Sequence, residues 1–238
     1  MSRPPIRTEA RFYEKGEWDT AFCKLCPHQC SVAPSRPGAC GVRTNRNCVL
    51  LVDNYGKVAS TDVVDDAQLP LFYFEPGSRW LLVGMKGCTM RCPFCSTYQY
   101  SQIGGVRTEP LLPEELVAMA RTEGLAGVSF GVNEPVVSHE YVVDVFAQAR
   151  EYGLWTHVAT NGSWCEEPFE EMLRMTSAMT FGFKGFDEAF LQAECGGHLP
   201  FIKANVEAAA ARGLHFEASY LPIERDGRDW RKELQAFS

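Results

Sequence analysis

The sequence predicts a parallel α/β fold, a partial (β/α) barrel of the TIM type preceded by a small cysteine-rich, metal-binding module. From Trp80 onward, short apolar segments alternate with amphipathic ones, which is typical of parallel strands joined by right-handed helical crossovers. The ten cysteines fall mainly into two groups, one on each side of residue 79. The 238 residues, 45% of them hydrophobic, are enough for one substantial core.

The boundary is placed near residue 79, so that residues 1–79 form the N-terminal module and residues 80–238 form the barrel. The module contains a region rich in proline and glycine, which interrupt regular structure. Five cysteines lie in this region: Cys23, Cys26, Cys30, Cys40 and Cys48. A short segment with so little apolar content cannot bury enough area to order itself, so we expect a metal to organise it.

The expected ligands of this metal are Cys23, Cys26, Cys30 and Cys40, with His28 or Cys48 as substitutes. Four thiolates bind zinc as well as an iron–sulfur cluster, so the spacing leaves open whether the site holds zinc or a second cluster. The alternative is that these cysteines bind no metal and pack as small hydrophobic side chains.

The rest of the module is predicted to be a hairpin and a connector. Two short runs within residues 49–59 flank a turn at residues 53–56, which predicts a hairpin. The polar segment 60–68 is expected to be a connector, and the aromatic run 72–74 is expected to pack against the core.

Five strands and five helices are predicted after the boundary. The strands span residues 80–86, 128–132, 155–160, 178–184 and 215–221. The helices span residues 113–123, 138–152, 168–175, 199–212 and 229–237. Glu114 and Glu115 favour a helix start through the helix dipole, and Gly213 is typical of a helix end.

Polar residues and glycines follow several of the predicted strands. Residues 131–135 follow the second strand, residues 160–162 the third, and residues 184–185 the fourth. Chemistry in β/α barrels takes place at the C-terminal ends of the strands, so we expect these segments to share one rim. Each segment alone is also typical of an ordinary turn.

The second cysteine group directly follows the first predicted strand. Cys88, Cys92 and Cys95 form a CxxxCxxC pattern, with Phe94 immediately before the last thiol. A cubane iron–sulfur cluster is usually held by four thiolates, so three in one loop leave one iron free for another ligand. The alternatives are a structural zinc site, which prefers four nitrogen or sulfur ligands, and a chance group of buried thiols.

Sequence blocks over nearly the whole chain extend this pattern. They are CKLCPHQC, PGACGVR, NYGKVAS, PLFYFEPGS, GCTMRCPFCSTYQYSQ, GVNEPV, ATNG and FKGFDEAF. Together they resemble the radical S-adenosylmethionine (SAM) superfamily, and within it the AmmeMemoRadiSam-type proteins, relatives of the pyruvate formate-lyase activating enzymes. The cysteine pattern specifies the superfamily, and the first two blocks specify the subgroup.

The resemblance implies an enzyme that binds a 4Fe-4S cluster through Cys88, Cys92 and Cys95, and SAM at the open iron. An electron from the cluster then cleaves SAM to a 5′-deoxyadenosyl radical, which takes hydrogen from a substrate. The residues that the resemblance assigns to SAM are Asn133, Glu134 and Pro135 for the amino group, Thr160, Asn161 and Gly162 for the rest of the molecule, and Phe94 beside the cluster.

Two features depart from the family pattern. Relatives carry carboxylates that hold a monovalent cation near SAM, whereas this chain has Ala159 and Gly182 at the matching positions. We therefore expect no such cation site. Lys184, at a strand end, could contact a carboxylate or phosphate, but a solvated side chain is expected. The family core has six β/α units, whereas only five predicted strands follow the boundary, so the N-terminal module supplies an edge or the form is shortened.

Composition and charge set the expected location and partners. No apolar run approaches the roughly 18 residues that span a bilayer, and the N-terminus lacks the apolar core of a signal peptide, so we expect a cytoplasmic protein that binds no membrane. A net charge of −7 without a dense basic stripe argues against nucleic-acid binding. The cluster would require a flavodoxin or ferredoxin as electron donor.

Three functions remain open from the sequence. The protein could activate a partner protein by forming a glycyl radical on it, or it could modify a small molecule or peptide. It could also be a non-catalytic iron–sulfur protein that binds ligands or transfers electrons. No catalytic side chain is assigned, because the cofactor carries the chemistry. Cys165 and Cys195 are expected to be packed in the core.

Overall fold

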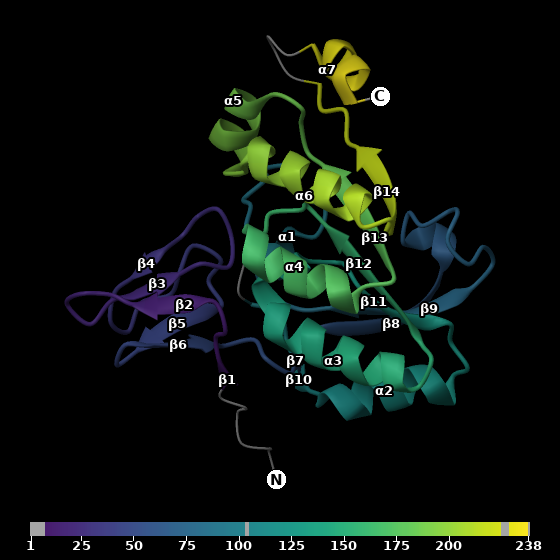
Figure 1. The fold of residues 1–238 in the computed structure, drawn as a ribbon, viewed down its shortest axis with the longest axis horizontal. Helices are drawn as coiled ribbons and strands as arrows, with labels where there is room; N and C mark the ends of the chain where they lie inside the picture. The colour runs from purple at the N-terminus through teal and green to yellow at the C-terminus, as the bar shows by residue number, and fades with distance from the viewer. Residues whose placement is uncertain (1–7, 103–104, 225–228, 238) are drawn as a thin grey trace.

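The structure is a computed structural model that describes residues 8–102, 105–224 and 229–237. Its main element is a six-stranded sheet in the order β14-β13-β12-β11-β9-β8 (Figure 1). The five parallel strands are β9 (Arg79–Gly84), β11 (Gly127–Phe130), β12 (Trp155–Thr160), β13 (Ala178–Phe183) and β14 (His215–Tyr220). The sixth strand, β8 (Ser60–Asp65), pairs antiparallel with β9 and forms one edge.

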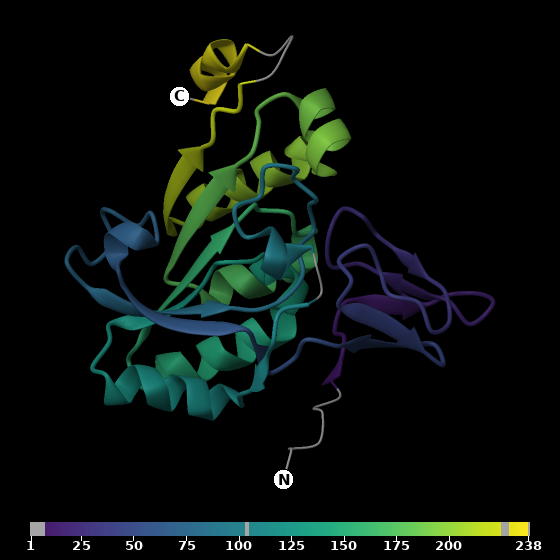
Figure 2. The ribbon, with the colours of Figure 1, turned by 180° about the vertical axis from the view of Figure 1, so that it is seen from behind.

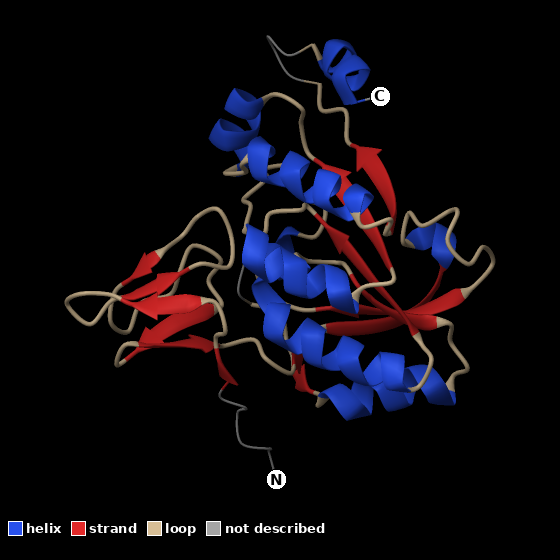
Figure 3. Cartoon of the chain, viewed as in Figure 1, coloured by secondary structure: helices blue, strands red, loops and turns tan. Residues whose placement is uncertain are grey.

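Four helices lie along one face of this sheet (Figure 3). They are α2 (Pro113–Thr122), α3 (His139–Glu151), α4 (Glu166–Met175) and α6 (Leu199–Ala211). The helix α2 begins at a proline and carries two glutamates in its first turn, which suits the exposed N–H groups and positive dipole of a helix start. The buried residues of α4 are spaced so that they share one face: Pro168, Phe169, Met172 and Leu173.

The remaining helical segments are shorter. They are the 3-10 helices η1 (Asp66–Gln68) and η2 (Pro135–Ser138), the α-helices α1 (Tyr98–Ser101), α5 (Glu188–Phe190) and α7 (Trp230–Phe237), and the π-helical turn η3 (Leu191–Cys195). Figure 2 shows the molecule from behind, with the edge strand β8 in front of the parallel strands. No helix within the described ranges is long and apolar enough to cross a membrane.

The mixed α/β fold with a parallel sheet is confirmed, as are the five strands and five helices predicted after residue 79. In the described part of the chain the two edge strands, β8 and β14, each pair with one neighbour only, so the sheet is open between them. The partial barrel and the division at residue 79 therefore stay predictions.

The N-terminal module contains small antiparallel sheets. One consists of β1 (Thr8–Glu9), β6 (Val49–Val52) and β5 (Arg43–Arg46), and another of β2 (Tyr13–Lys15), β3 (Ala21–Cys23) and β4 (Ser31–Val32). The predicted hairpin over residues 49–59 is wrong, because β6 pairs with β1 and β5. The second predicted run, β7 (Lys57–Val58), pairs instead with the distant β10 (Glu109–Pro110).

The predicted connector 60–68 is also wrong, because most of it is the strand β8. An edge strand keeps one side in solvent, and β8 buries only Val64, so its polar composition hides its pairing with β9. Apolar side chains of the module and of the parallel sheet share one continuous core, which includes Leu25 and Leu50 from the module and Val83 and Phe130 from the sheet.

Candidate active site

The three-cysteine segment, residues 85–97, follows β9 and is called the Cys loop below. It begins with a sharp turn at Gly87, whose φ is +94°. A side chain at this position would put its Cβ 3.0 Å from the carbonyl oxygen of Cys40 and from both methyl groups of Val42. Only glycine suits both the left-handed conformation and this close approach, so the turn depends on Gly87.

The Cys loop and the C-terminal ends of the parallel strands line one cavity of about 300 Å³. Eight of the residues assigned to the cluster and to SAM line it: Cys88, Cys92, Phe94, Cys95, Asn133, Glu134, Thr160 and Asn161. Pro135 and Gly162, also assigned to SAM, are not part of its lining. Pro135 starts η2, and the Gly162 N–H donates to Thr160 Oγ1 at 2.9 Å, so both act on the backbone around the site.

Glu134 is the only acidic residue among those that line the cavity, and it is 4% exposed. Its carboxylate accepts hydrogen bonds from Thr160 Oγ1 at 2.6 Å, from the Asn161 N–H at 2.8 Å and from the Val136 N–H at 3.2 Å. Burial raises the pKa of Glu134 to about 7, although the three donors stabilise the carboxylate and act to lower this pKa. The carboxylate is therefore a fixed part of the wall that joins the ends of β11 and β12.

Two asparagines hold the Cys loop from the strand ends. Asn133 Oδ1 accepts from the Met85 N–H at 2.8 Å, and its Nδ2 donates to the Gly87 carbonyl at 3.0 Å. Asn161 Nδ2 donates to Thr89 Oγ1 at 2.9 Å and lies 3.8 Å from Cys88 Sγ. These amides position the loop, which the sequence pattern alone did not indicate.

The thiols of the Cys loop are partly desolvated. Burial, reinforced by the negative charge of Glu134, raises the pKa of Cys88, and the Met90 N–H donates to its sulfur at 3.3 Å. Cys95 Sγ lies 3.3 Å from Ser101 Oγ. The neighbouring thiol of Cys195, which is fully buried and was expected only to pack, and burial both raise the pKa of Cys92.

The thiols and polar groups that line this cavity are of the kind that can hold an iron–sulfur cluster with SAM beside it. Three thiols border the same cavity, next to polar strand ends, and two of them, Cys88 and Cys95, have an N–H or hydroxyl neighbour. Across the described ranges, no three His, Cys, Asp or Glu side chains are already gathered around one metal position.

Lys184 also lines the cavity, although the sequence predicted a solvated side chain. It follows β13 and folds back over Gly182, where an added Cβ would lie 3.2 Å from Lys184 Nζ and 3.8 Å from Ser219 Oγ. Within the described residues Lys184 has no hydrogen bond or ion pair. The sequence signal for this inward position is Gly182, which lies two residues earlier on the same face of the strand.

The N-terminal cysteines border a second, smaller cavity of about 10 Å³. Its lining includes all four predicted ligands, Cys23, Cys26, Cys30 and Cys40, together with Arg43. The two substitutes are placed elsewhere. Cys48 Sγ donates to Asp19 Oδ1 at 3.2 Å, and the His28 ring lies 2.5 Å from the Thr89 carbonyl oxygen.

Comparisons with known proteins agree with this geometry. Residues 82–234 match the sequence model of the radical SAM superfamily. An uncharacterized protein of Methanocaldococcus jannaschii is 31% identical over 217 residues, which cover 90% of this chain but only 64% of that protein.

Two structures of Streptococcus suis SuiB are similar in fold. The form bound to S-adenosylmethionine has a TM-score of 0.51 at 13% identity, over 65% of this chain and 35% of SuiB. The form bound to the precursor peptide SuiA has a TM-score of 0.50 at 15% identity, over 65% and 34% of the two chains. At this identity the similarity concerns the fold alone. The family match covers more than half of the chain, and the protein therefore belongs to the radical SAM superfamily.

Proposed function

We propose that this protein cleaves SAM reductively and uses the resulting radical to take a hydrogen atom from a substrate. The observation that carries the proposal is the cavity in which Cys88, Cys92 and Cys95 meet Glu134 and Asn161. Membership of the radical SAM superfamily supports an enzyme that uses SAM, while the particular reaction is our inference.

Cys88, Cys92 and Cys95 would hold a 4Fe-4S cluster and leave one iron for SAM. When bound, the reduced cluster supplies the electron that splits SAM into methionine and a 5′-deoxyadenosyl radical. The chain itself supplies position and shielding. Met90, Phe94 and Leu221 add apolar surface to the cavity, and such surface keeps water away from a reactive intermediate.

The polar end of SAM would lie against the corner formed by residues 133–135 and 160–162. The side chains of Asn133 and Glu134 already bond to the protein, so the groups left for SAM are mainly backbone atoms of this corner. Lys184 is the one cationic residue among those that line the cavity, and its positive charge acts on Glu134.

The hydrogen donor is proposed to be a partner protein that receives a glycyl radical, in keeping with the resemblance to activating enzymes. A cavity of about 300 Å³ lies at the small end of ligand pockets, so bound SAM would fill most of it. The donor group must then enter from the mouth, which suits a peptide segment. Deuterium transfer into 5′-deoxyadenosine from a labelled glycine of the partner, rather than from a small molecule or another peptide position, tests this choice.

The test of SAM cleavage compares three forms of the full chain after anaerobic reconstitution. These are the wild type, the triple variant Cys88→Ala/Cys92→Ala/Cys95→Ala, and Cys165→Ala, a thiol outside the lining of both cavities. With dithionite and SAM, 5′-deoxyadenosine is expected from the wild type and the Cys165 variant only. The wild type could instead carry a full cluster and bind SAM but form no 5′-deoxyadenosine, with or without candidate substrates. That result would favour a non-catalytic iron–sulfur protein.

Three further parts of the proposal follow from the sequence. The parallel sheet is proposed to curve into a partial barrel around the cavity, and a flavodoxin or ferredoxin is proposed as electron donor. The four N-terminal cysteines are proposed to hold zinc or a second iron–sulfur cluster. Their common cavity supports a metal there, and either metal accepts four thiolates.

A further inference from the structure

The small N-terminal cavity is lined by thiols from four separate segments. Cys23 ends β3, Cys26 lies in the following turn, Cys30 precedes β4, and Cys40 lies in the loop before β5. The rest of the lining is apolar or lacks a side chain, apart from Arg43. At Gly38, an added Cβ would lie 3.7 Å from Cys30 Sγ. The fold thus places four thiols and one cationic side chain around this cavity, although among the described residues no three of the thiols are already gathered around one metal position.

A backbone N–H group points to one of these sulfurs, that of Cys30. The Ala39 N–H donates to Cys30 Sγ at 3.4 Å. A sulfur that accepts such bonds is stabilised in its charged form, which is the form that binds metals.

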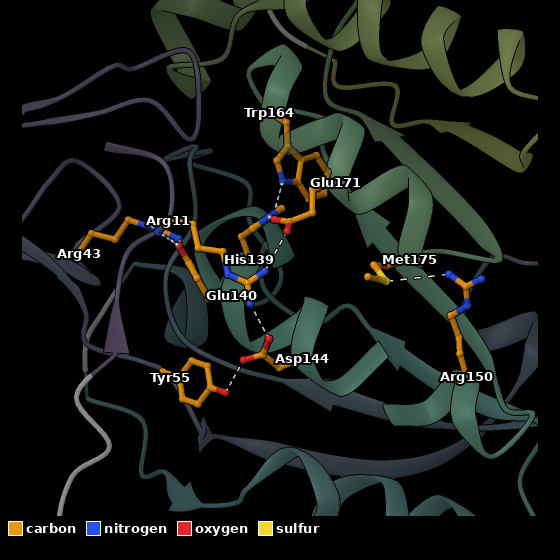
Figure 4. A network of polar contacts seen from close by, with 10 residues as sticks. All are labelled: Arg11, Arg43, Tyr55, His139, Glu140, Asp144, Arg150, Trp164, Glu171 and Met175. Atoms are coloured by element: carbon orange, nitrogen blue, oxygen red, sulfur yellow. Dashed lines mark hydrogen bonds and ion pairs between the residues drawn. The ribbon is translucent and has the colours of Figure 1, made fainter. Parts of the chain in front are cut away.

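Arg43 is the charged residue among those that line this cavity. Its side chain is 2% exposed and forms a bidentate pair with the 1% exposed carboxylate of Glu140, at the start of α3 (Figure 4). Its Nε is buried and has no hydrogen-bond partner in the described part of the structure. Because Arg43 also lines the cavity, a thiolate there would give this N–H an acceptor.

The cysteine segment also touches the Cys loop directly. Gly87 approaches the Cys40 carbonyl so closely that no side chain fits between them, and Arg91 Nη2 donates to the Ala39 carbonyl at 2.9 Å. These two contacts lie on either side of Cys88. A ligand bond to Cys40 would therefore fix the backbone against which the Cys loop is packed.

We propose that Cys23, Cys26, Cys30 and Cys40 bind one metal centre as four thiolates, and that Arg43 balances their charge and fastens the centre to α3 through Glu140. Four thiolates exceed the charge of a zinc ion or of an oxidised cubane cluster, so a buried cation beside them stabilises either centre. This inference rests on the proposed metal at the N-terminal cysteines and is independent of SAM cleavage.

The test uses the full chain in the Cys88→Ala/Cys92→Ala/Cys95→Ala background, which removes the cluster of the Cys loop. After anaerobic purification and reconstitution, zinc and iron per chain are measured, with Mössbauer spectra for the iron. About one zinc or about four irons should remain. This remaining metal should be lost when Cys23→Ala/Cys26→Ala is added to the background, whereas it should be retained when Cys48→Ala is added. Absence of both metals, or equal content after Cys23→Ala/Cys26→Ala, would overturn the proposal. If the wild type does not cleave SAM, the proposed metal centre is unaffected, because it does not depend on SAM cleavage.

The role of Arg43 is tested by the rate at which a chelator takes the metal from the folded protein. Arg43→Met is expected to speed release about 10-fold, since a charge-assisted bond is lost. Arg46→Met is the matched control, because Arg46 is exposed at the end of the same strand. Should Arg43→Met not fold, Arg43→Lys keeps the charge but loses the Nε donor, and faster release is expected there too. Release at the wild-type rate in the folded Arg43 variants would refute the role of Arg43.

Discussion

The Thr160 hydroxyl donates a 2.6 Å hydrogen bond to the carboxylate of Glu134, and this bond joins the end of β12 to the segment that follows β11. Both residues line the cavity that also contains the three thiols of the Cys loop. The neighbouring Asn161 N–H donates to the same carboxylate at 2.8 Å. The shape of the proposed SAM site thus depends on one buried acid and the donors around it.

Replacing Thr160 by valine should weaken SAM binding about 10-fold. The change keeps the volume but removes the donor to Glu134, which leaves a buried carboxylate less satisfied and raises its pKa above about 7. Equilibrium binding of SAM to the reconstituted protein measures the effect. Thr156→Val is the matched control, since Thr156 is a buried threonine of the same strand that bonds to the Met175 carbonyl instead. Equal affinity of all three proteins would contradict this role for Thr160.

Gly87→Ala should destabilise the fold by about 2 to 4 kcal/mol and lower the cluster content. The alanine would hold a strained φ and press its Cβ against the Cys40 carbonyl at 3.0 Å. Urea unfolding and iron analysis measure the two effects.

Gly124→Ala separates strain from crowding, because Gly124 has φ +60° but nothing within 4 Å of an added Cβ. It should cost only about 1 kcal/mol and leave the iron content unchanged. Similar losses in the two variants would mean that the contact with the N-terminal module does not matter.

Lys184→Met should weaken SAM binding about 10-fold or more. Lys184 is the one cationic residue of the cavity lining, and it forms no hydrogen bond or ion pair with the described residues, although its charge acts on Glu134. Its ammonium can therefore donate to an anionic group of a ligand. Lys232→Met changes the same residue type on the exposed side of α7 and should bind like wild type. An unchanged dissociation constant for Lys184→Met would show that SAM does not use this ammonium.

The parallel sheet could be predicted because its strands are marked by local patterns. The strands β9 and β13 contain short apolar runs, and the helices between the strands carry amphipathic spacing and start signals such as Glu114 and Glu115. The strand β8 was missed because an exposed edge needs few apolar residues. The pairing of β7 with β10 joins segments about 50 residues apart, and no local pattern reports such a contact.

The segments that form the candidate site could be predicted from the sequence, but the contacts of their individual side chains could not. The Cys loop and the segments 133–135 and 160–162 are set by spacing and by strand ends, which sequence retains. Whether Asn133 contacts a ligand or the loop depends on rotamers fixed by the Met85 and Gly87 backbone. The inward position of Lys184 depends on the space above Gly182, which becomes evident only once the strand is built.

His157 should make the protein sensitive to acid. It is fully buried on β12, with Ser129 Oγ at 2.8 Å and Thr180 Oγ1 at 3.0 Å from its ring nitrogens. Burial, and secondarily the charge of His215, lowers the pKa of His157 from 6.5 to about 3. The unfolded chain takes up this proton below pH 6.5, whereas the folded chain does not until about pH 3. The stabilisation is therefore complete above pH 6.5 and is lost as the pH falls towards 3, by at most about 5 kcal/mol.

His157→Gln keeps a side chain that can bond to both hydroxyls but does not titrate, so its stability should fall less between pH 7.5 and pH 5 than that of wild type. Urea unfolding at several pH values measures the difference in slope, because other groups titrate equally in both proteins. If His157→Gln loses as much stability on acidification as wild type, the neutral buried imidazole is not the acid-sensitive group. If the free energy of unfolding of His157→Gln is lower at every pH but changes with pH as in wild type, the substitution disturbs packing alone.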